Sequence, residues 1–247
     1  IASEVQDYLN NGYNYFAKKF CNIDKHRFDI KQEVIAKSGL FVTKKRYGLK
    51  IINDNGKKVN KMMVKGLDTV RSSFPIAMRE MLSKLLEDIL MDVPKDKLDK
   101  FILNFKNSMK LMDFEKISVP TSVKNVQKYV DKDRKGFAPY KKGTPVHVKS
   151  AIAYNDLLKY YNQDKRYEKI SNGSKVKWLY LKNNNLGLET VAFKGYEDPP
   201  EIMNFIRDNI NPSKLYKQAL HKKIMMLYQA LGWDEPTDAT KTIERFF

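Results

Sequence analysis

The stretch FVTKKRYGLKIINDNGKKVNKMMV, residues 41–64, decides the fold expected for the first part of the chain. It is rich in Val, Ile and aromatic residues, and the tetrapeptide NDNG at 53–56 interrupts it in the pattern of a tight hairpin turn. Together with RFDIKQEVIA at 27–36, it predicts strands over 27–36, 39–52 and 57–64. These strands should form a small antiparallel sheet.

The predicted strand 39–52 carries a polar and basic cluster, Thr43, Lys44, Lys45 and Arg46, between two apolar runs. Such a cluster could contact phosphate groups, because Lys and Arg side chains supply most protein contacts to nucleic-acid backbones. A solvent-facing β-ribbon explains the charge equally well. The neighbouring sequence has to decide between the two interpretations.

The composition favours a globular protein that binds polyanions. The 247 residues include 46 Lys and Arg against 29 Asp and Glu, a formal net charge of +17, and 42% hydrophobic residues, enough for a core. We find no signal peptide and no apolar run near the roughly 20 residues of a membrane-spanning helix. The single cysteine, Cys21, excludes an internal disulfide and a Cys-rich metal site, fits a reducing cytoplasm, and is expected to be buried as a small apolar residue.

Helical spacing of apolar residues dominates most of the remaining chain. It predicts an amphipathic helix over 3–20 and two long helices, one within 71–90 and one around 98–109. A β-hairpin is predicted over 175–193, and two helices over 201–209 and 211–231 follow it. The expected fold class is therefore α+β, with a small antiparallel sheet and packed helix followed by a mainly helical region that contains a β-hairpin.

A second basic segment covers residues 132–149 and has a net charge of +5. Its first part contains Gly and Pro and should be a loop, and a helix should then begin with Thr144 as N-cap and Pro145 at the first helical position. A lysine-rich loop next to a helix N-terminus can bind an anion, and a solvated basic loop fits the composition equally well. The basic residues of this segment are Lys132, Arg134, Lys135, Lys141, Lys142 and Lys149.

The last residues end on three large apolar side chains, Ile243, Phe246 and Phe247. Their spacing places all three on one side of a single helical turn, which is typical of a short peptide that anchors in a partner's apolar pocket. The alternative is that they fold back onto the core of this chain.

Signatures of catalysis are mostly missing from the sequence. There is no Gly-rich phosphate loop, and the three histidines fall in separate predicted elements. No acidic pair is placed to hold two metal ions, and the nearest candidate, Asp68, is isolated and fits a turn or capping role equally well. The residues alone predict a chain that binds nucleic acid without doing chemistry on it.

Four motifs, taken in order, resemble family B DNA polymerases. TKKRYGLKI at 43–51 and MVKGLDTVRSSFPIAMREMLSKLLEDIL at 63–90 resemble the end of the palm and the first thumb helix of that family. YKKGTPVHVKSAIAYNDLL at 140–158 is similar to a further thumb segment, and TIERFF at 242–247 resembles a sliding-clamp-binding tail, with Thr240 where related peptides often have Gln. The combination is most similar to the T-even bacteriophage type of replicative polymerase.

The resemblance implies an organisation for the chain. Residues 1–72 would be the C-terminal part of the palm, 73–233 the thumb, and 234–247 a flexible tail whose Ile243, Phe246 and Phe247 bind the clamp. The catalytic carboxylates would lie outside the chain, so Mg²⁺ is implied only for the complete polymerase, and an N-terminal polymerase portion would be a partner if the gene is split. The residues implied to bind primer-template DNA are Lys44, Lys45, Arg46, Tyr47, Lys65, Arg71, Lys141, Lys142, Thr144, His147 and Lys149.

Two other functions compete with this interpretation. A stand-alone, non-catalytic nucleic-acid-binding protein would explain the charge but not the ordered motifs or the terminal peptide. An independently active enzyme would need metal ligands, which the sequence does not present.

Overall fold

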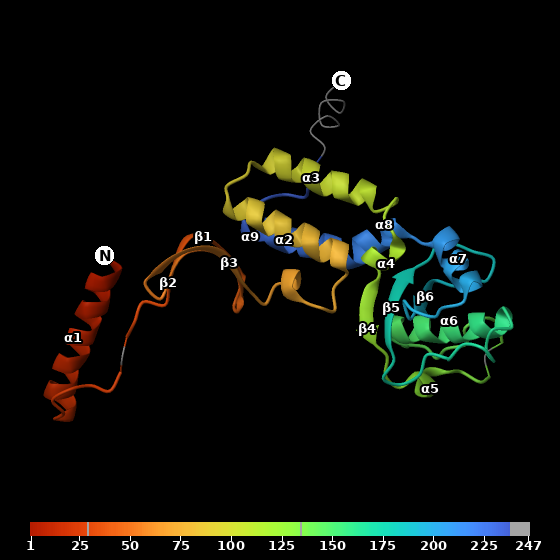
Figure 1. The fold of residues 1–247 in the computed structure, drawn as a ribbon, viewed down its shortest axis with the longest axis horizontal. Coiled ribbons are helices and arrows are strands. Elements are labelled where there is room, and N and C mark those ends of the chain that lie inside the picture. The colour runs from red at the N-terminus through yellow and green to blue at the C-terminus, as the bar shows by residue number, and fades with distance from the viewer. Residues whose placement is uncertain (29, 134, 238–247) are drawn as a thin grey trace, which may run out of the picture. The chain divides into compact units, whose positions relative to one another are not determined.

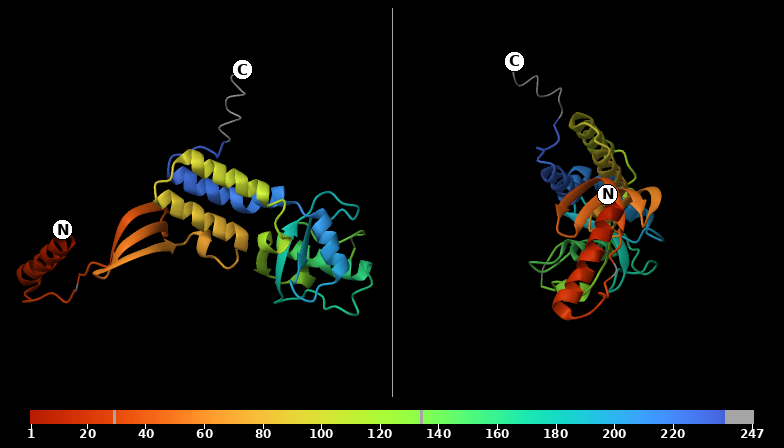
Figure 2. Two further views of the ribbon diagram at one scale, coloured as in Figure 1. Left: turned by 45° about the horizontal axis from the view of Figure 1, so that its top comes forward. Right: turned by 90° about the vertical axis from the view of Figure 1, so that its left-hand side faces the viewer.

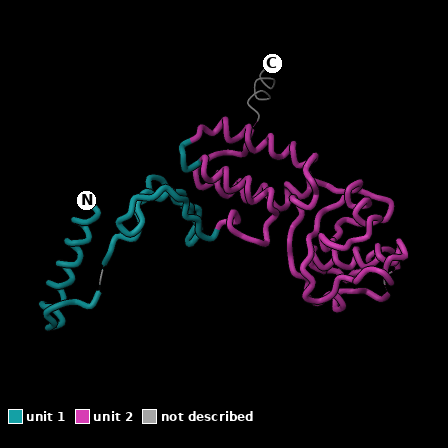
Figure 3. Tube along the Cα trace, in the orientation of Figure 1, with its two compact units in different colours: residues 1–66, 89–92 teal, residues 67–88, 93–247 magenta. Residues whose placement is uncertain are grey.

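A computed structural model describes residues 1–28, 30–133 and 135–237 of the chain (Figure 1). The chain divides into two compact units, drawn in different colours in Figure 3. The first comprises residues 1–66 and 89–92, and the second comprises residues 67–88 and 93–247. The first unit combines one helix with a three-stranded antiparallel sheet, and the second combines several helices with another, which confirms the predicted α+β class.

The sheet of the first unit is a simple antiparallel meander, with the strand order β1-β2-β3. Its strands are β1 (Val34–Thr43), β2 (Arg46–Asp54) and β3 (Lys57–Lys65). The predicted hairpin turn is confirmed: Asn55 and Gly56 connect β2 to β3 with φ angles of 51° and 82°. Asn and Gly tolerate this left-handed conformation best, so the turn chemistry sets the register of both strands.

Two details of the predicted strands were wrong. Residues 39–52 form two strands rather than one, because Lys44 and Lys45 make a turn that pairs Thr43 with Arg46. The strand expected over 27–36 begins only at Val34. The basic cluster thus lies at the tip of a hairpin, where charged side chains reach solvent without any loss of sheet packing.

The predicted N-terminal helix is confirmed as α1 (Ala2–Cys21). Hydrogen bonds join it to the segment before β1: the Asn10 side-chain amide donates to the carbonyl of Ile30, and Gln32 N–H donates to Gln6 Oε1. Cys21 is exposed, so the expectation that it is buried was wrong. The apolar residues that predicted the helix are also exposed, by 39–64%: Val5, Leu9, Tyr13, Phe16 and Phe20.

Three helices of the second unit, one of which ends in the first unit, pack around apolar side chains. They are α2 (Ile76–Leu90), α3 (Lys95–Ser108) and α9 (Lys222–Ala230), which lie side by side in both Figure 1 and Figure 2. Both predicted helices near 71–109 are therefore confirmed. The buried residues on these helices include Met78, Leu82, Leu85, Leu98, Ile102, Ile224 and Leu227.

The rest of the second unit is built on the sheet β4-β5-β6, which α6 (Val146–Tyr160) contacts. The strands are β4 (Val119–Ser122), β5 (Lys175–Tyr180) and β6 (Thr190–Phe193), so the predicted hairpin over 175–193 is confirmed. The shorter elements are a 3₁₀ turn (Asp68–Val70), α4 (Phe114–Ile117), α5 (Val126–Tyr129), α7 (Pro200–Asn209), α8 (Pro212–Leu215) and a π-helical stretch (Tyr216–His221).

The segment after α9 is held against the helices of the second unit. Gly232 has a φ of 68° and ends the helix as predicted, and the Trp233 ring lies edge-on to Tyr228 at 5.3 Å between centroids. Asp99, which is 4% exposed, accepts hydrogen bonds from Tyr228 Oη (2.9 Å) and from Thr237 N–H (3.3 Å). The predicted anchor residues Ile243, Phe246 and Phe247 lie outside the described residues.

Candidate nucleic-acid interface

The turn between β1 and β2 gathers basic side chains at one end of the first sheet. Lys44 and Lys45 form the turn, Arg46 begins β2, and the register pairs Tyr47 with Lys65 at the end of β3. Within the described ranges, no carboxylate forms an ion pair with Lys44, Lys45 or Lys65. We call these five residues the basic end of the sheet.

The conformation of the turn depends on Gly66, the residue directly after β3. A Cβ atom at position 66 would lie 2.3 Å from the backbone oxygen of Lys45, and Gly66 has a φ of 66°. The Arg46 side chain crosses the same place and donates from Nε to the Gly66 carbonyl at 3.2 Å. Only glycine allows this approach, so the Gly of the Lys-Gly-Leu-Asp segment fixes the turn against β3.

Lys45 itself has a φ of 65°, which is unusual for a residue with a side chain. The left-handed region costs an L-residue about 1–2 kcal/mol relative to its ordinary conformations. The chain therefore places a lysine where glycine or asparagine would be conformationally easier. The turn thus accepts backbone strain and presents a charged side chain, and such strain is often found at functional sites.

Phe41 adds an exposed aromatic ring to the basic end, and sequence reasoning missed it. It pairs across the strands with Tyr47, and the two ring centroids are 5.6 Å apart. Phe41 is 69% exposed, and Gly39 leaves room beside it, since a Cβ there would lie 3.3 Å from the Phe41 ring. The hairpin register would have predicted this pair once the turn at Lys44 and Lys45 was known.

Asp68 and Arg71 form an ion pair in the second unit. Asp68 is 5% exposed, and its two carboxylate oxygens lie 3.2 Å from a guanidinium nitrogen of Arg71 and 3.0 Å from Lys223 Nζ. Asp68 thus links the start of the unit to α9, a structural role that agrees with its isolation in the sequence. The predicted contact residue Arg71 is half-exposed but shares its charge with this carboxylate.

The second predicted basic segment closes into a loop. A bridge pairs Val130 with Tyr140, and Lys141 N–H donates to the carbonyl of Tyr129 at 3.0 Å. Lys149, at the start of α6, holds its Nζ 4.7 Å from the centre of the Tyr140 ring. Arg134 lies outside the described residues. The remaining lysines of the loop are exposed: Lys132, Lys135, Lys141 and Lys142.

Thr144 and His147 differ from the other predicted contact residues. Thr144 is not the N-cap of α6: its hydroxyl donates to the carbonyl of Lys141 at 2.6 Å, its side chain is buried, and Pro145 precedes the first helical residue. Burial lowers the pKa of His147, so its imidazole is uncharged at neutral pH. Of these two residues, neither supplies positive charge to this surface.

Among residues 1–28, 30–133 and 135–237, no three His, Cys, Asp or Glu side chains are grouped so that they could hold a metal ion. No helix in these ranges has the length and apolar character needed to cross a membrane.

A comparison with protein families identifies the chain. Residues 8–231 match the DNA polymerase family B domain, which covers both units. The chain therefore belongs to DNA polymerase family B, and the resemblance inferred from the four motifs is confirmed at the level of the family. No curated protein matches the sequence significantly.

Proposed function

We propose that the chain grips duplex DNA during replication, with the basic end of the first sheet as a principal contact. Membership of a DNA polymerase family implies DNA as the partner. The observation that carries the proposal is that Lys44, Lys45 and Lys65 lie at the same end of the sheet as the exposed Phe41 ring and the half-buried Tyr47 ring. Lysines without carboxylate partners can bind phosphates without first breaking an ion pair, and the rings can pack on the sugars.

The salt dependence of duplex binding tests this grip. If the basic end and the loop at 132–149 together neutralise six phosphates, the slope of log K against log salt should be about −5, at roughly −0.9 per phosphate. Binding of the chain to a primer-template duplex, measured by fluorescence anisotropy at several salt concentrations, gives the slope. A value near −1 would rule out the grip.

A matched pair of double variants separates this site from general charge. Replacing Lys44 and Lys45 by Gln should reduce the slope by about 2. Replacing Lys57 and Lys58 by Gln removes the same charge from the opposite end of the same sheet and should change the slope by less than about 0.5. Equal changes in both variants would show that net charge alone drives binding.

We further propose that the chain is the end of the palm (1–72), the thumb (73–233) and a tail (234–247) of a polymerase of the T-even phage type. The order of the four motifs supports this, and so does the exposed apolar side of α1, which a further polymerase portion could cover. The catalytic carboxylates, and the Mg²⁺ ions that they would bind, would belong to that portion. Primer extension by this chain alone, with nucleotides and Mg²⁺, would contradict the assignment.

The terminal residues Ile243, Phe246 and Phe247 complete the proposal as a sliding-clamp peptide. Tethering to a clamp raises the effective concentration of the polymerase at the primer end and so lengthens products without changing single additions. In the complete polymerase, deletion of 243–247 should shorten products when the clamp is present. Products of unchanged length would argue against the tether.

A further inference from the structure

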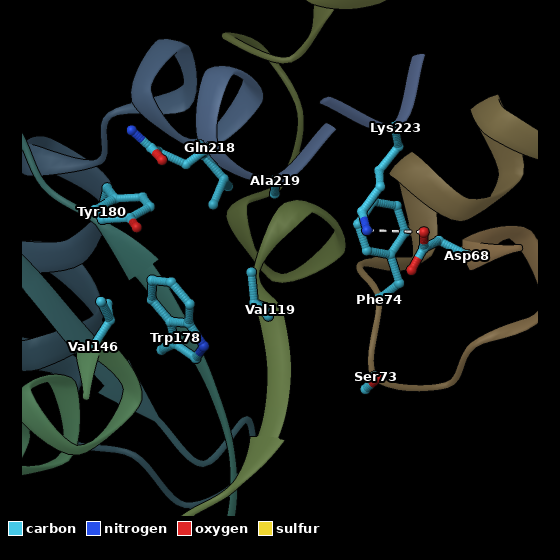
Figure 4. Close-up of a pocket in the computed structure, with 11 residues that line it drawn as sticks. Asp68, Ser73, Phe74, Val119, Val146, Trp178, Tyr180, Gln218, Ala219 and Lys223 are labelled. Carbon is cyan, nitrogen blue, oxygen red and sulfur yellow. Dashed lines mark ion pairs between the residues drawn. The ribbon is translucent and has the colours of Figure 1, made fainter. Parts of the chain in front are cut away.

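The second unit contains a cavity of about 390 Å³ that the proposed grip on the duplex does not use. It lies between the face of β5, the start of the unit and the π-helical stretch after α8 (Figure 4). Its volume falls in the range of small-ligand sites, about 300–1,000 Å³. Its lining is mostly apolar and aromatic, with a few polar groups.

Two aromatic rings form one side of the cavity. Trp178 and Tyr180 stand two residues apart on β5, so they project from the same face of the strand, and their ring centroids are 5.2 Å apart at 80°. A flat ligand can therefore stack on one ring while the edge of the other contacts its rim. Within the described part of the chain, the indole N–H and the Tyr180 hydroxyl donate to no protein acceptor, and neither atom is among the buried polar atoms that lack a partner, so both remain available as donors to a ligand.

The polar groups around the rings suit an uncharged ligand with a hydrogen-bonding edge. Across the cavity from the two rings, Phe74 lies beside the Asp68–Lys223 ion pair (Figure 4), and Asp68 also pairs with Arg71, so its negative charge is already balanced by cations. The exposed Gln218 carries its amide on the Tyr180 side of the cavity, and an amide offers both a donor and an acceptor. Gln218 belongs to the π-helical stretch, a rare conformation that is frequent at functional sites.

A cation stands next to the aromatic side. Lys214 on α8 holds its Nζ 5.0 Å from the centre of the Tyr180 ring. Burial, and then the Glu189 carboxylate, raises the pKa of Tyr180, so its hydroxyl remains a donor at neutral pH. The site thus combines an apolar slot for a planar ring with a positive charge close to its edge.

We propose that this cavity binds one unpaired base of a DNA strand, stacked on Trp178 or Tyr180, with Gln218 contacting its edge and Lys214 its phosphate. Only one part of this proposal, that the bound strand is DNA, rests on the proposed function. Stacking on aromatic side chains adds to the affinity for single strands whatever their sequence, because every base has a π-face.

Fluorescence of Trp178 tests the site directly. The chain has two tryptophans, so a Trp233→Phe background leaves Trp178 as the only one and keeps an aromatic ring against Tyr228. A short oligothymidylate should quench this fluorescence saturably and bind at least roughly 10-fold more tightly than an abasic strand of the same length. Equal binding of the two strands, or no quenching, would overturn the proposal.

Thymidine monophosphate should bind more weakly than the strand, and equal or tighter binding would overturn the assignment to a strand.

Two variants check the roles of the aromatic side. Tyr180→Ala should weaken binding of the oligothymidylate by roughly 5- to 150-fold, and Tyr180→Phe should retain most of it. Neither variant should change the salt slope for duplex DNA. Conversely, the Lys44 and Lys45 double variant should reduce that slope and leave the quenching of Trp178 by oligothymidylate intact. Loss of duplex and single-strand binding together in Tyr180→Ala would contradict a separate site. The two proposals can therefore fail independently.

Discussion

Substitution of Gly66 by Ala is expected to unfold the basic end of the first sheet locally. The new Cβ would lie 2.3 Å from the Lys45 backbone oxygen, and φ at 66° is in the left-handed region. Strain and steric overlap together should cost about 2–4 kcal/mol. Both tryptophans lie in the second unit, so hydrogen exchange of peptides covering 41–66 is the suitable measurement.

Gly56 provides the matched control at the other end of the sheet. Its φ is 82°, but nothing lies within 4 Å of a Cβ built there. Gly56→Ala should therefore lose only the conformational part, about 1–2 kcal/mol. Similar losses of protection in both variants would mean that the contact between Gly66 and Lys45 does not hold the turn.

Replacement of Asp99 by Ala should destabilise the helices of the second unit by about 3 kcal/mol. The buried carboxylate accepts from Tyr228 Oη at 2.9 Å and from Thr237 N–H at 3.3 Å and pairs with Lys95 Nζ at 2.6 Å, so its loss leaves three donors without their acceptor. Burial, together with the hydrogen bond to Asp99, raises the pKa of Tyr228, so the hydroxyl stays a donor at all ordinary pH values. Urea unfolding followed by Trp233 fluorescence in a Trp178→Phe background measures the effect, because the Trp233 ring packs on Tyr228.

Asp96, one turn earlier on α3, separates this network from the general effect of removing a carboxylate. It is exposed and lies in the first turn of the helix, where an acidic side chain contributes less than about 1 kcal/mol. Asp96→Ala should therefore be nearly neutral. If Asp99→Ala were equally mild, the buried carboxylate could not be what holds Tyr228.

The first sheet shows which turns a sequence can reveal. Asn55 and Gly56 are the residues that a left-handed turn prefers, so the β2–β3 hairpin was predicted correctly. Lys44 and Lys45 carry no such signal, and the turn between them depends on Gly66, which is twenty-one residues further along the chain. Because this contact is tertiary, local patterns merged β1 and β2 into one strand, and Phe41 was not recognised as the partner of Tyr47.

The long helices were predictable because their apolar residues are regularly spaced and are buried in a core. Helix α1 has the same spacing, but its apolar residues are exposed here, so periodicity predicted the helix and not its burial. The role of Thr144 was missed for a different reason. Its hydroxyl donates back to Lys141 instead of capping α6, and both choices are compatible with the same sequence.

The hydrogen bond between Asp99 and Thr237 sets a limit on the distance that the proposed clamp peptide can travel. Thr237 is fixed against α3, and Ile243 follows six residues later. A chain of six residues spans at most about 22 Å even when fully extended. If the terminal phenylalanines bind a clamp as proposed, the clamp would therefore be held within this distance of α3 and would not move freely at the end of a long linker.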